Sequence, residues 1–326
     1  KNFITIKYHF MQNIWISIII PCYNVQDFIL KTLSSVLSQT YSCYEIIIVD
    51  DGSYDSTYEV VCSKLQNLPN CKIIKKDNGG VSSARNIGLQ HAVGKYVYFL
   101  DGDDIIEQNF IESIKLNLQD EDIALVGYSK EIINNKKQLY VPSKSKKYIN
   151  EYLSGKLYIC MSSIILKKDF LVENSIVFDE NTHYSEDREF IAKALYKAKQ
   201  IKIIEEILFH YIYRAGSAMN TADYTERRST SLNAMERVYH LFEQDKTLAN
   251  LALIQLQTTI LLHYKMVYNS RHLNSIMENK IKVFLAKYIS LPVRFLWNKF
   301  SLYVSVFKFL YQLNPKLFHI LLTRKI

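Results

Sequence analysis

Residues 99–104 read FLDGDD, and they follow a strand-forming run from Tyr96 to Leu100. The glycine between the first two aspartates lets backbone and side chains crowd around a small ligand. Carboxylates held this close repel one another unless a cation lies among them. Oxygen ligands suit a hard ion, so the stretch indicates a Mg²⁺ or Mn²⁺ site that leaves coordination positions for water and phosphate. The alternative is an acidic turn that caps the helix expected near Asn109.

Three apolar runs of strand length precede this stretch, at Ile16–Ile20, Glu45–Val49 and Lys72–Ile74. The segment after the first run has helical spacing, with Asp27 as the expected N-cap and an apolar stripe at Ile29, Leu33, Val36 and Leu37. Strands and helices therefore alternate, which predicts an α/β fold with a mostly parallel sheet. Such sheets bind ligands just beyond the carboxyl ends of their strands, where the polar segments of this chain fall.

The polar segments carry side chains suited to a nucleotide. Tyr23 can stack on a base, Asp51 can accept from an imide N–H, and Arg85 can face phosphate. Each also has a structural explanation: Tyr23 as packing at the sheet edge, Asp51 as a helix cap and Arg85 as part of a solvated helix face. Four such segments after successive strands make coincidence a poor explanation.

Four ordered motifs resemble those of family 2 glycosyltransferases with the GT-A fold. They are SIIIPCYN (17–24), VDDGSYDST (49–57), NGGVSSARNIGL (78–89) and FLDGDD (99–104). The resemblance covers roughly the first third of the chain. It implies a Rossmann-like sheet that binds a nucleotide-sugar donor, with Mn²⁺ or Mg²⁺ bridging the donor diphosphate.

The resemblance also implies roles for individual residues. Asp103 would be the chief metal ligand, and Asp101 would lie near both ribose and metal. The remaining donor-binding residues would be Pro21, Tyr23, Asn24, Asp51, Ser53, Arg85, Asn86 and Gly102.

Three later features extend the resemblance. Glu186-Asp187 opens a predicted helix, where the family places its catalytic base; this gives Asp187 that role and Glu186 a supporting one, against the alternative of an acidic first helical turn. Arg214 and Ser217 follow a predicted strand, Ile207–Tyr213, and resemble a segment that closes over the donor diphosphate. His210 is a further metal-ligand candidate, although a lone histidine in a strand is more often structural.

The composition supports a large core. The chain has 326 residues, of which 48% are hydrophobic, and its five cysteines lack C-x-x-C spacing, as expected in a reduced cytoplasmic compartment. We expect an N-terminal extension (1–12), a GT-A catalytic domain (13–222) with nucleotide-binding (13–104) and acceptor (105–222) halves, and a helical basic region (223–326). A lysine-rich stretch, 127–150, is expected to be a solvated loop with Asn134-Asn135 as its turn. A part in acceptor binding is left open.

The net charge of +8 is concentrated near the C-terminus. Residues 279–326 contain nine Lys or Arg and no Asp or Glu. Between Val293 and Gln312 the polar residues form one narrow stripe on a broadly apolar helix: Arg294, Asn298, Ser301, Ser305, Lys308 and Gln312. Such a helix, which also carries Trp297, either packs on protein or seats on an anionic membrane surface.

The leading hypothesis is a metal-dependent inverting glycosyltransferase. It would move a sugar from a nucleotide-sugar, UDP-linked by expectation, to a glycan or lipid-linked saccharide at the inner face of a bacterial membrane. We expect no nucleic-acid partner, and a homo-oligomer is left open. The alternatives are a non-catalytic scaffold subunit of a polysaccharide assembly complex and, less favoured, a sugar nucleotidyltransferase, because Pro21-Cys22-Tyr23-Asn24 stands where a glycine-rich phosphate loop would be.

Overall fold

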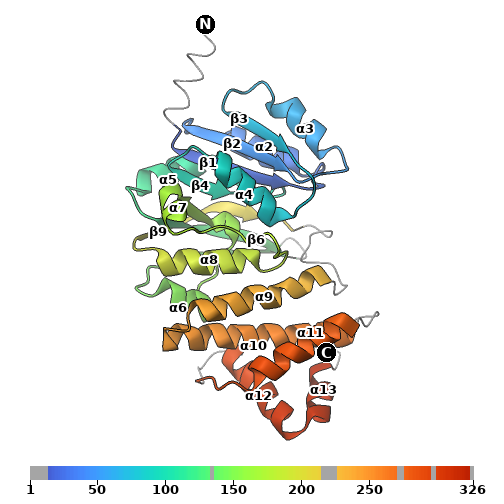
Figure 1. Ribbon diagram of the computed structural model, residues 1–326. Helices are drawn as coiled ribbons and strands as arrows, with labels where there is room; N and C mark the ends of the chain where they lie inside the picture. Colours follow the sequence, from blue (N-terminus) through green and yellow to red (C-terminus); the bar gives the residue numbers. More distant parts are fainter. Residues whose placement is uncertain (1–13, 133–135, 214–225, 270–274, 295–298, 324–326) are drawn as a thin grey trace. The chain divides into compact units, whose positions relative to one another are not determined.

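A computed structural model describes residues 14–132, 136–213, 226–269, 275–294 and 299–323 (Figure 1). The chain divides into two compact units. Among the described residues, the sheet unit comprises 14–132, 136–146, 158–180 and 194–213. The helical unit comprises 147–157, 181–193, 226–269, 275–294 and 299–323. The domain boundary that the sequence places at residue 222 stays a prediction.

The first part of the sheet unit alternates strands and helices as predicted. Its elements are β1 (Ile16–Cys22), α2 (Ile29–Leu37), β2 (Tyr44–Asp50), α3 (Thr57–Leu65), β3 (Cys71–Lys75), α4 (Val81–His91) and β4 (Tyr96–Phe99). The predicted Asp27 cap is wrong: Phe28 is the N-cap residue of α2, with no side-chain capping bond.

The rest of the unit contains shorter elements. They are β5 (Ile105–Ile106), α5 (Phe110–Asn117), β6 (Ile123–Ile132), β7 (Lys136–Tyr140), a 3-10 turn at Met161–Ser163, β8 (Ile164–Lys167), α7 (Lys168–Glu173) and β9 (Ile201–Tyr211). The predicted solvated loop at 127–150 is wrong in part, because β6 and β7 pair as an antiparallel hairpin there. Its expected turn, at Asn134-Asn135, lies outside the described residues.

One sheet of nine strands is formed by the described residues, in the order β3-β2-β1-β4-β8-β6-β9-β5 with β7 beside β6. Strands β1 to β4 pair in parallel, as predicted, and β6 pairs with β9 in parallel. Strand β8 runs antiparallel to both β4 and β6, so the whole sheet is mixed and β6 runs parallel to β4. The carboxyl ends of β1, β2, β3, β4, β6 and β9 therefore share one edge of the sheet.

The core of the sheet unit explains why these strands read as continuous apolar runs. One face, which includes Ile18 and Tyr98, packs against apolar residues of α2, α3 and α5. The opposite face is covered by α4, where a Cβ added at Gly88 would come within 2.2 Å of Ile19. Burial on both faces leaves no position in β1, β2 or β4 for an exposed side chain, which matches the pattern expected of central strands.

The helical unit has its own core, built from Leu232, Leu256, Ile260 and Val304 among others. Its elements are α6 (Tyr148–Leu153), α9 (Glu226–Leu241), α10 (Lys246–Asn269), α11 (Ser275–Phe284), a π-helical turn at Leu285–Ile289, α12 (Lys299–Leu313) and α13 (Pro315–Thr323). Helix α8 (Glu186–Lys197) contributes residues 186–193 to this unit and 194–197 to the sheet unit. Every helix among the described residues is too short or too polar to cross a bilayer.

Candidate active site

The loops that follow β1 and β2 are joined into one structure at the carboxyl edge of the sheet. The Asn24 amide donates to Ser53 Oγ at 3.0 Å, and the Tyr54 amide donates to Asn24 Oδ1 at 3.1 Å. Asn24 has a φ of 52°, a left-handed conformation that asparagine tolerates better than most residues. Tyr23 and Tyr54 meet edge to face, with ring centroids 6.1 Å apart, and both rings are exposed. The sequence prediction missed Tyr54, which offers a second ring to a base.

The Asp50-Asp51 pair divides into two roles. Asp51 organises the loop after β3, because its carboxylate accepts from the Gly79 amide at 2.9 Å, the Gly80 amide at 2.8 Å and Lys76 Nζ at 2.6 Å. These hydrogen bonds within the protein were not predicted from the sequence, which assigned Asp51 to base binding. Asp50 is also buried, and its Oδ2 accepts from the Ser53 amide at 3.3 Å. Its Oδ1 has no hydrogen-bond partner among the described residues, so Asp50 joins the candidate site as an acceptor.

Helix α4 directs Arg85 toward the acidic loop. The buried guanidinium lies 5.3 Å from the ring centre of Phe178 and donates from Nη2 to Asp101 Oδ1 at 2.8 Å. The predicted solvated helix face is therefore not the environment of Arg85. The contact fixes the orientation of Asp101, whose side chain remains 37% exposed.

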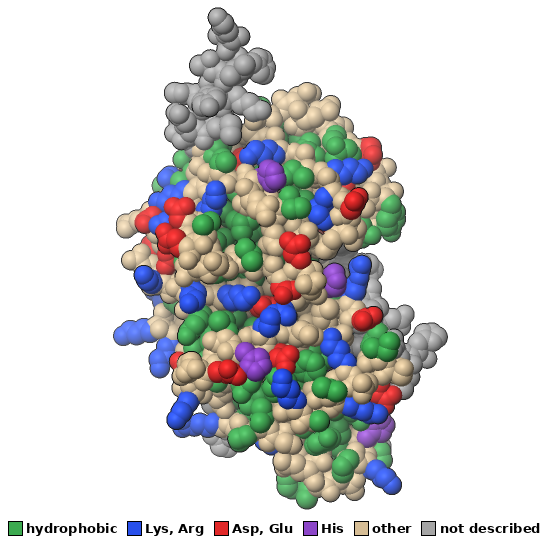
Figure 2. All heavy atoms as spheres, in the orientation of Figure 1, with side chains coloured by type: hydrophobic (Ala, Val, Ile, Leu, Met, Phe, Trp, Pro, Cys, Tyr) green, Lys and Arg blue, Asp and Glu red, His purple; other side chains and the backbone are tan. Residues whose placement is uncertain are grey.

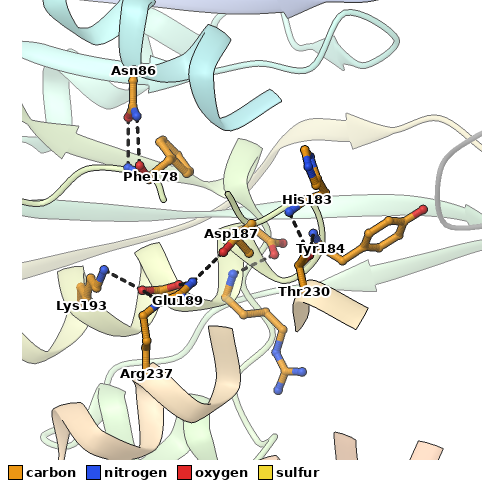
Figure 3. A network of polar contacts seen from close by, with 11 residues as sticks. Asn86, Phe178, His183, Tyr184, Asp187, Glu189, Lys193, Thr230 and Arg237 are labelled. Carbon is orange, nitrogen blue, oxygen red and sulfur yellow. Dashed lines mark hydrogen bonds and ion pairs between the residues drawn. The ribbon is translucent and has the colours of Figure 1, made fainter. Parts of the chain in front are cut away.

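Asn86 is committed to the protein. Its Nδ2 donates to the Phe178 carbonyl and to Glu180 Oε1, both at 3.0 Å, and its Oδ1 accepts from the Phe178 amide at 3.0 Å (Figure 3). The side-chain amide thus holds the 178–180 segment against α4. This is a positioning role for a residue that the sequence placed near the nucleotide.

The FLDGDD loop packs closely on the loop after β1. A Cβ added at Gly102 would lie 3.4 Å from both the Pro21 carbonyl oxygen and Cys22 Sγ, so the absence of a side chain permits this approach. The Gly102 carbonyl accepts from Thr32 Oγ1 at 3.1 Å. Burial raises the pKa of the Cys22 thiol, and the charges of Asp50, Asp103 and Asp101 raise it further. The three carboxylates therefore act on one small volume.

Asp104 braces the loop. It is buried, and its Oδ1 accepts from the Ile212 amide, just beyond β9, at 2.9 Å. The sequence left open whether Asp104 touches a metal, and this contact assigns it to the loop structure. Asp103 is partly exposed on the same loop.

His210 has both ring nitrogens engaged. Nδ1 lies 2.7 Å from Ser129 Oγ, and Nε2 lies 2.6 Å from Glu107 Oε1. Because both nitrogens have partners in the protein, we do not include His210 among the candidate metal ligands.

The carboxylates of the FLDGDD loop could supply only part of the ligand shell of a hard divalent cation. Asp101 and Asp103 supply carboxylate oxygens, which Mg²⁺ and Mn²⁺ prefer. No group of three or more His, Cys, Asp or Glu residues suited to a metal occurs among the described residues. A cation here would therefore take its other ligands from a diphosphate and water, as Mg²⁺ commonly does.

The candidate base lies in the helical unit, in the first turn of α8. The Asp187 Oδ1 accepts from the Arg188 amide at 2.7 Å, and Glu186 precedes it. Ser185, the residue before the helix, has a φ of 64°. Helix α9 holds the approach to this turn, because Thr230 Oγ1 accepts from the His183 amide at 3.0 Å (Figure 3). Burial lowers the pKa of His183, as does the nearby charge of Arg227.

An ion pair between the buried Glu189 carboxylate and the partly exposed Arg237 fixes α8 to α9. Glu189 accepts from Arg237 Nε at 2.9 Å and Nη2 at 2.7 Å, and Lys193 Nζ lies 2.8 Å away (Figure 3). Arg237 Nη2 also donates to Thr182 Oγ1 at 2.6 Å. One side chain of α9 thereby ties the helix bearing Asp187 to the segment that precedes it. Arg214 and Ser217 lie outside the described residues.

The fold and the order of the loops are those of the GT-A type, and comparison with known proteins agrees. The sequence profile of Glycosyl transferase family 2 matches residues 17–204, which is more than half of the chain. The chain belongs to this family, as its motifs predicted.

Two curated relatives come from Bacillus subtilis strain 168. The uncharacterized glycosyltransferase EpsJ is 30% identical over 210 residues, which cover 61% of this chain and 60% of EpsJ. The minor teichoic acid biosynthesis protein GgaB is 33% identical over 219 residues, which cover 63% of this chain and 24% of GgaB. The chain thus spans less than two thirds of the length of either relative.

Solved structures share the fold at low sequence identity. Staphylococcus aureus TarS 1–349, in complex with UDP-GlcNAc, is 22% identical with a TM-score of 0.60, and the match covers 84% of this chain and 80% of that one. The mannosyltransferase PcManGT from Pyrobaculum calidifontis, in complex with GDP-Man and Mn²⁺, is 14% identical with a TM-score of 0.53, covering 97% and 94%. The predicted GT-A fold is confirmed.

Proposed function

We propose that the chain is an inverting glycosyltransferase that uses a UDP-sugar. One observation carries the proposal: three loops at the carboxyl edge of the sheet contact one another and gather the groups a nucleotide diphosphate needs. The Asp51 amide donates to the Cys22 carbonyl at 2.9 Å, Gly102 packs on Pro21 and Cys22, and Arg85 pairs with Asp101. Support for UDP comes from the structural neighbour TarS, which was solved with UDP-GlcNAc.

Different residues are proposed to bind different parts of the donor. The exposed rings of Tyr23 and Tyr54 offer stacking surfaces for the base, and the free Oδ1 of Asp50, together with Asp51, offers acceptors for its imide N–H. Asp103 and Asp101 would hold Mn²⁺ or Mg²⁺, which when bound offsets charge on the diphosphate. Arg85 keeps Asp101 oriented toward ribose and metal.

The reaction is a single displacement. Asp187 accepts the proton of the acceptor hydroxyl as that oxygen attacks the anomeric carbon. The new C–O bond forms as the bond to the diphosphate breaks, UDP leaves with the bonding electrons, and the anomeric configuration inverts. Glu186 supports Asp187 in this role. Arg214 and Ser217 are proposed to stabilise the leaving diphosphate.

The acceptor is proposed to be a saccharide, free or lipid-linked, of a bacterial surface glycan. The relative GgaB carries teichoic acid biosynthesis in its name. The excess of basic residues in 279–326 supports a proposed location at an anionic membrane surface, on the cytoplasmic side where nucleotide-sugars are made.

A donor panel tests the proposal. Thermal unfolding is measured with Mn²⁺ and each nucleotide-sugar, because a ligand that binds only the folded state raises the melting temperature. The stabilising donor is then used in hydrolysis and transfer assays with the wild type and Asp187→Asn. Stabilisation by one UDP-sugar, with turnover that Asp187→Asn abolishes, is the expected result. If both proteins are equally inert toward every donor, the chain is instead a scaffold with this fold.

A further inference from the structure

Helix α12 presents a row of apolar side chains to solvent, and α13 presents further exposed apolar side chains. On α12 the row consists of Leu302, Val306, Phe309 and Leu313, which are 47% to 66% exposed. Their steps of four, three and four residues place them on one helix face. Leu317, Ile320 and Leu321 of α13 are also exposed. Figure 2 shows hydrophobic side chains at the surface of this region.

Two polar residues of α12, Ser301 and Lys308, face the protein instead. Ser301 is fully buried, and Lys308 Nζ donates to the Leu291 carbonyl at 2.8 Å. Burial lowers the pKa of Lys308. The sequence predicted a polar stripe through these two residues, and the structure places this part of the stripe inward. A surface helix ordinarily has the opposite arrangement, so the outer face of α12 needs a further apolar cover.

The charge around this face favours one kind of cover. Residues 299–326 contain five Lys or Arg residues and no acidic residue. Of those whose side chains are described, Lys308 is hydrogen-bonded to the protein and Lys316 is exposed. In the sequence, Lys316 lies between the exposed leucines Leu313 and Leu317. In a two-fold contact between copies, this segment would offer no carboxylate to offset the charge of Lys316. Anionic headgroups above an acyl layer supply both the negative charge and the apolar environment.

We infer that the outer face of α12 and α13 inserts into the headgroup boundary of an anionic bilayer. The apolar row enters the acyl boundary while Lys316 meets phosphate. This inference rests on the proposed membrane location and names the surface responsible for it. It is independent of the transfer chemistry, because none of these residues belongs to the candidate active site.

Vesicle co-sedimentation of the full chain tests the inference. One set of vesicles is phosphatidylcholine alone, and the other is phosphatidylcholine and phosphatidylglycerol in equal parts. Phe309→Glu/Leu313→Glu should lower the partition coefficient on anionic vesicles by about tenfold or more, because two inserting side chains are replaced by charges. Leu116→Glu, at an exposed leucine of α5, is the matched control and should bind like the wild type.

A second variant keeps the test informative if the double variant fails to fold. Lys316→Glu should weaken binding to the anionic vesicles and leave binding to the neutral ones unchanged. Equal sedimentation of wild type and both variants would overturn the inference. So would light scattering that shows a wild-type dimer which the double variant converts to a monomer, because the face would then join two copies. A preparation that binds vesicles but is inactive toward every donor would support the surface and count against the proposed chemistry.

Discussion

The Arg85 guanidinium donates to Asp101 at 2.8 Å from a buried position beside Phe178, so the first carboxylate of the FLDGDD loop is oriented before any donor arrives. Charge-assisted bonds of this kind contribute about 1.5–3 kcal/mol. Arg85→Ala should therefore weaken UDP binding in the presence of Mn²⁺ by about 10- to 100-fold. Calorimetric titration measures the affinity. Lys31→Ala, at an exposed lysine of α2, is the control, and an unchanged affinity in a folded Arg85→Ala protein would refute the role.

Asp103 and Asp104 should respond differently to substitution. Asp103→Asn removes a proposed metal ligand, so the stabilisation of the protein by UDP should lose its dependence on Mn²⁺. Asp104→Ala instead leaves the Ile212 amide without its acceptor, and should cost about 1–3 kcal/mol of unfolding free energy. Thermal unfolding with UDP, with and without Mn²⁺, separates the two effects. Retained Mn²⁺ dependence in Asp103→Asn would move the metal site elsewhere.

Asp187→Asn should abolish transfer without affecting donor binding. General bases contribute about 10²- to 10⁴-fold to rate, so turnover should fall by that factor while the affinity for UDP stays at the wild-type value. Glu186→Gln should have a smaller effect, because Glu186 is assigned only support. Transfer is followed by UDP release. If Glu186→Gln were the more damaging change, the base would be Glu186.

Arg237 should act as a positioning residue. Its guanidinium gives Glu189 two hydrogen bonds and Thr182 one, so Arg237→Ala leaves the buried Glu189 carboxylate with its ion pair to Lys193. We expect a loss of about 3 kcal/mol in unfolding free energy, the lower end for a broken buried pair, because Arg237 is partly exposed.

The kinetic signature of Arg237→Ala should be a lower kcat with an unchanged KM for the donor. Arg237→Lys should recover part of the loss, since one ion pair with Glu189 remains available. Arg227→Ala, at an exposed arginine of the same helix, is the matched control. A raised KM with an unchanged kcat would show that Arg237 serves donor binding instead.

The strands could be predicted because burial on both faces imposes an unbroken apolar run, as in Ile16–Ile20. The β6-β7 hairpin was missed because Lys136 and Lys137 resemble a solvated loop, whereas strand β7 pairs only along one side and tolerates lysine. The family motifs were sufficient to predict the GT-A fold. They were not sufficient to locate the exposed face of α12, because apolar residues surround that helix on several sides.

The site was harder to predict at the level of single side chains. A sequence shows that Asp51 and Asn86 follow strands, but not what they accept from or donate to. In the structure both are engaged by the protein itself, through Gly79, Gly80 and Phe178. Lys76 was missed for the same reason: only the fold brings its ammonium to 2.6 Å from Asp51. Polar residues of this kind fix the conformation of the loops on which the exposed site residues lie.

Acid should destabilise the helical unit through His263. This imidazole is buried beside Ser231, with Nε2 2.7 Å from the hydroxyl oxygen. Burial, together with the charges of Arg228 and Lys280, lowers the pKa of His263 to about 3. The unfolded chain binds the proton near pH 6.5, so the stabilisation is fully present above that pH and is lost as pH falls toward 3.

Between pH 7 and pH 5 the wild type should lose about 2 kcal/mol of unfolding free energy through this group, because one pKa unit corresponds to about 1.4 kcal/mol. His263→Gln should reduce the pH dependence by that amount, whereas His91→Gln, at an exposed histidine of α4, should leave it unchanged. Urea unfolding of the three proteins at both pH values measures the difference. Parallel curves for the wild type and His263→Gln would mean that His263 is protonated equally in the folded and unfolded states, and another group would then carry the acid sensitivity.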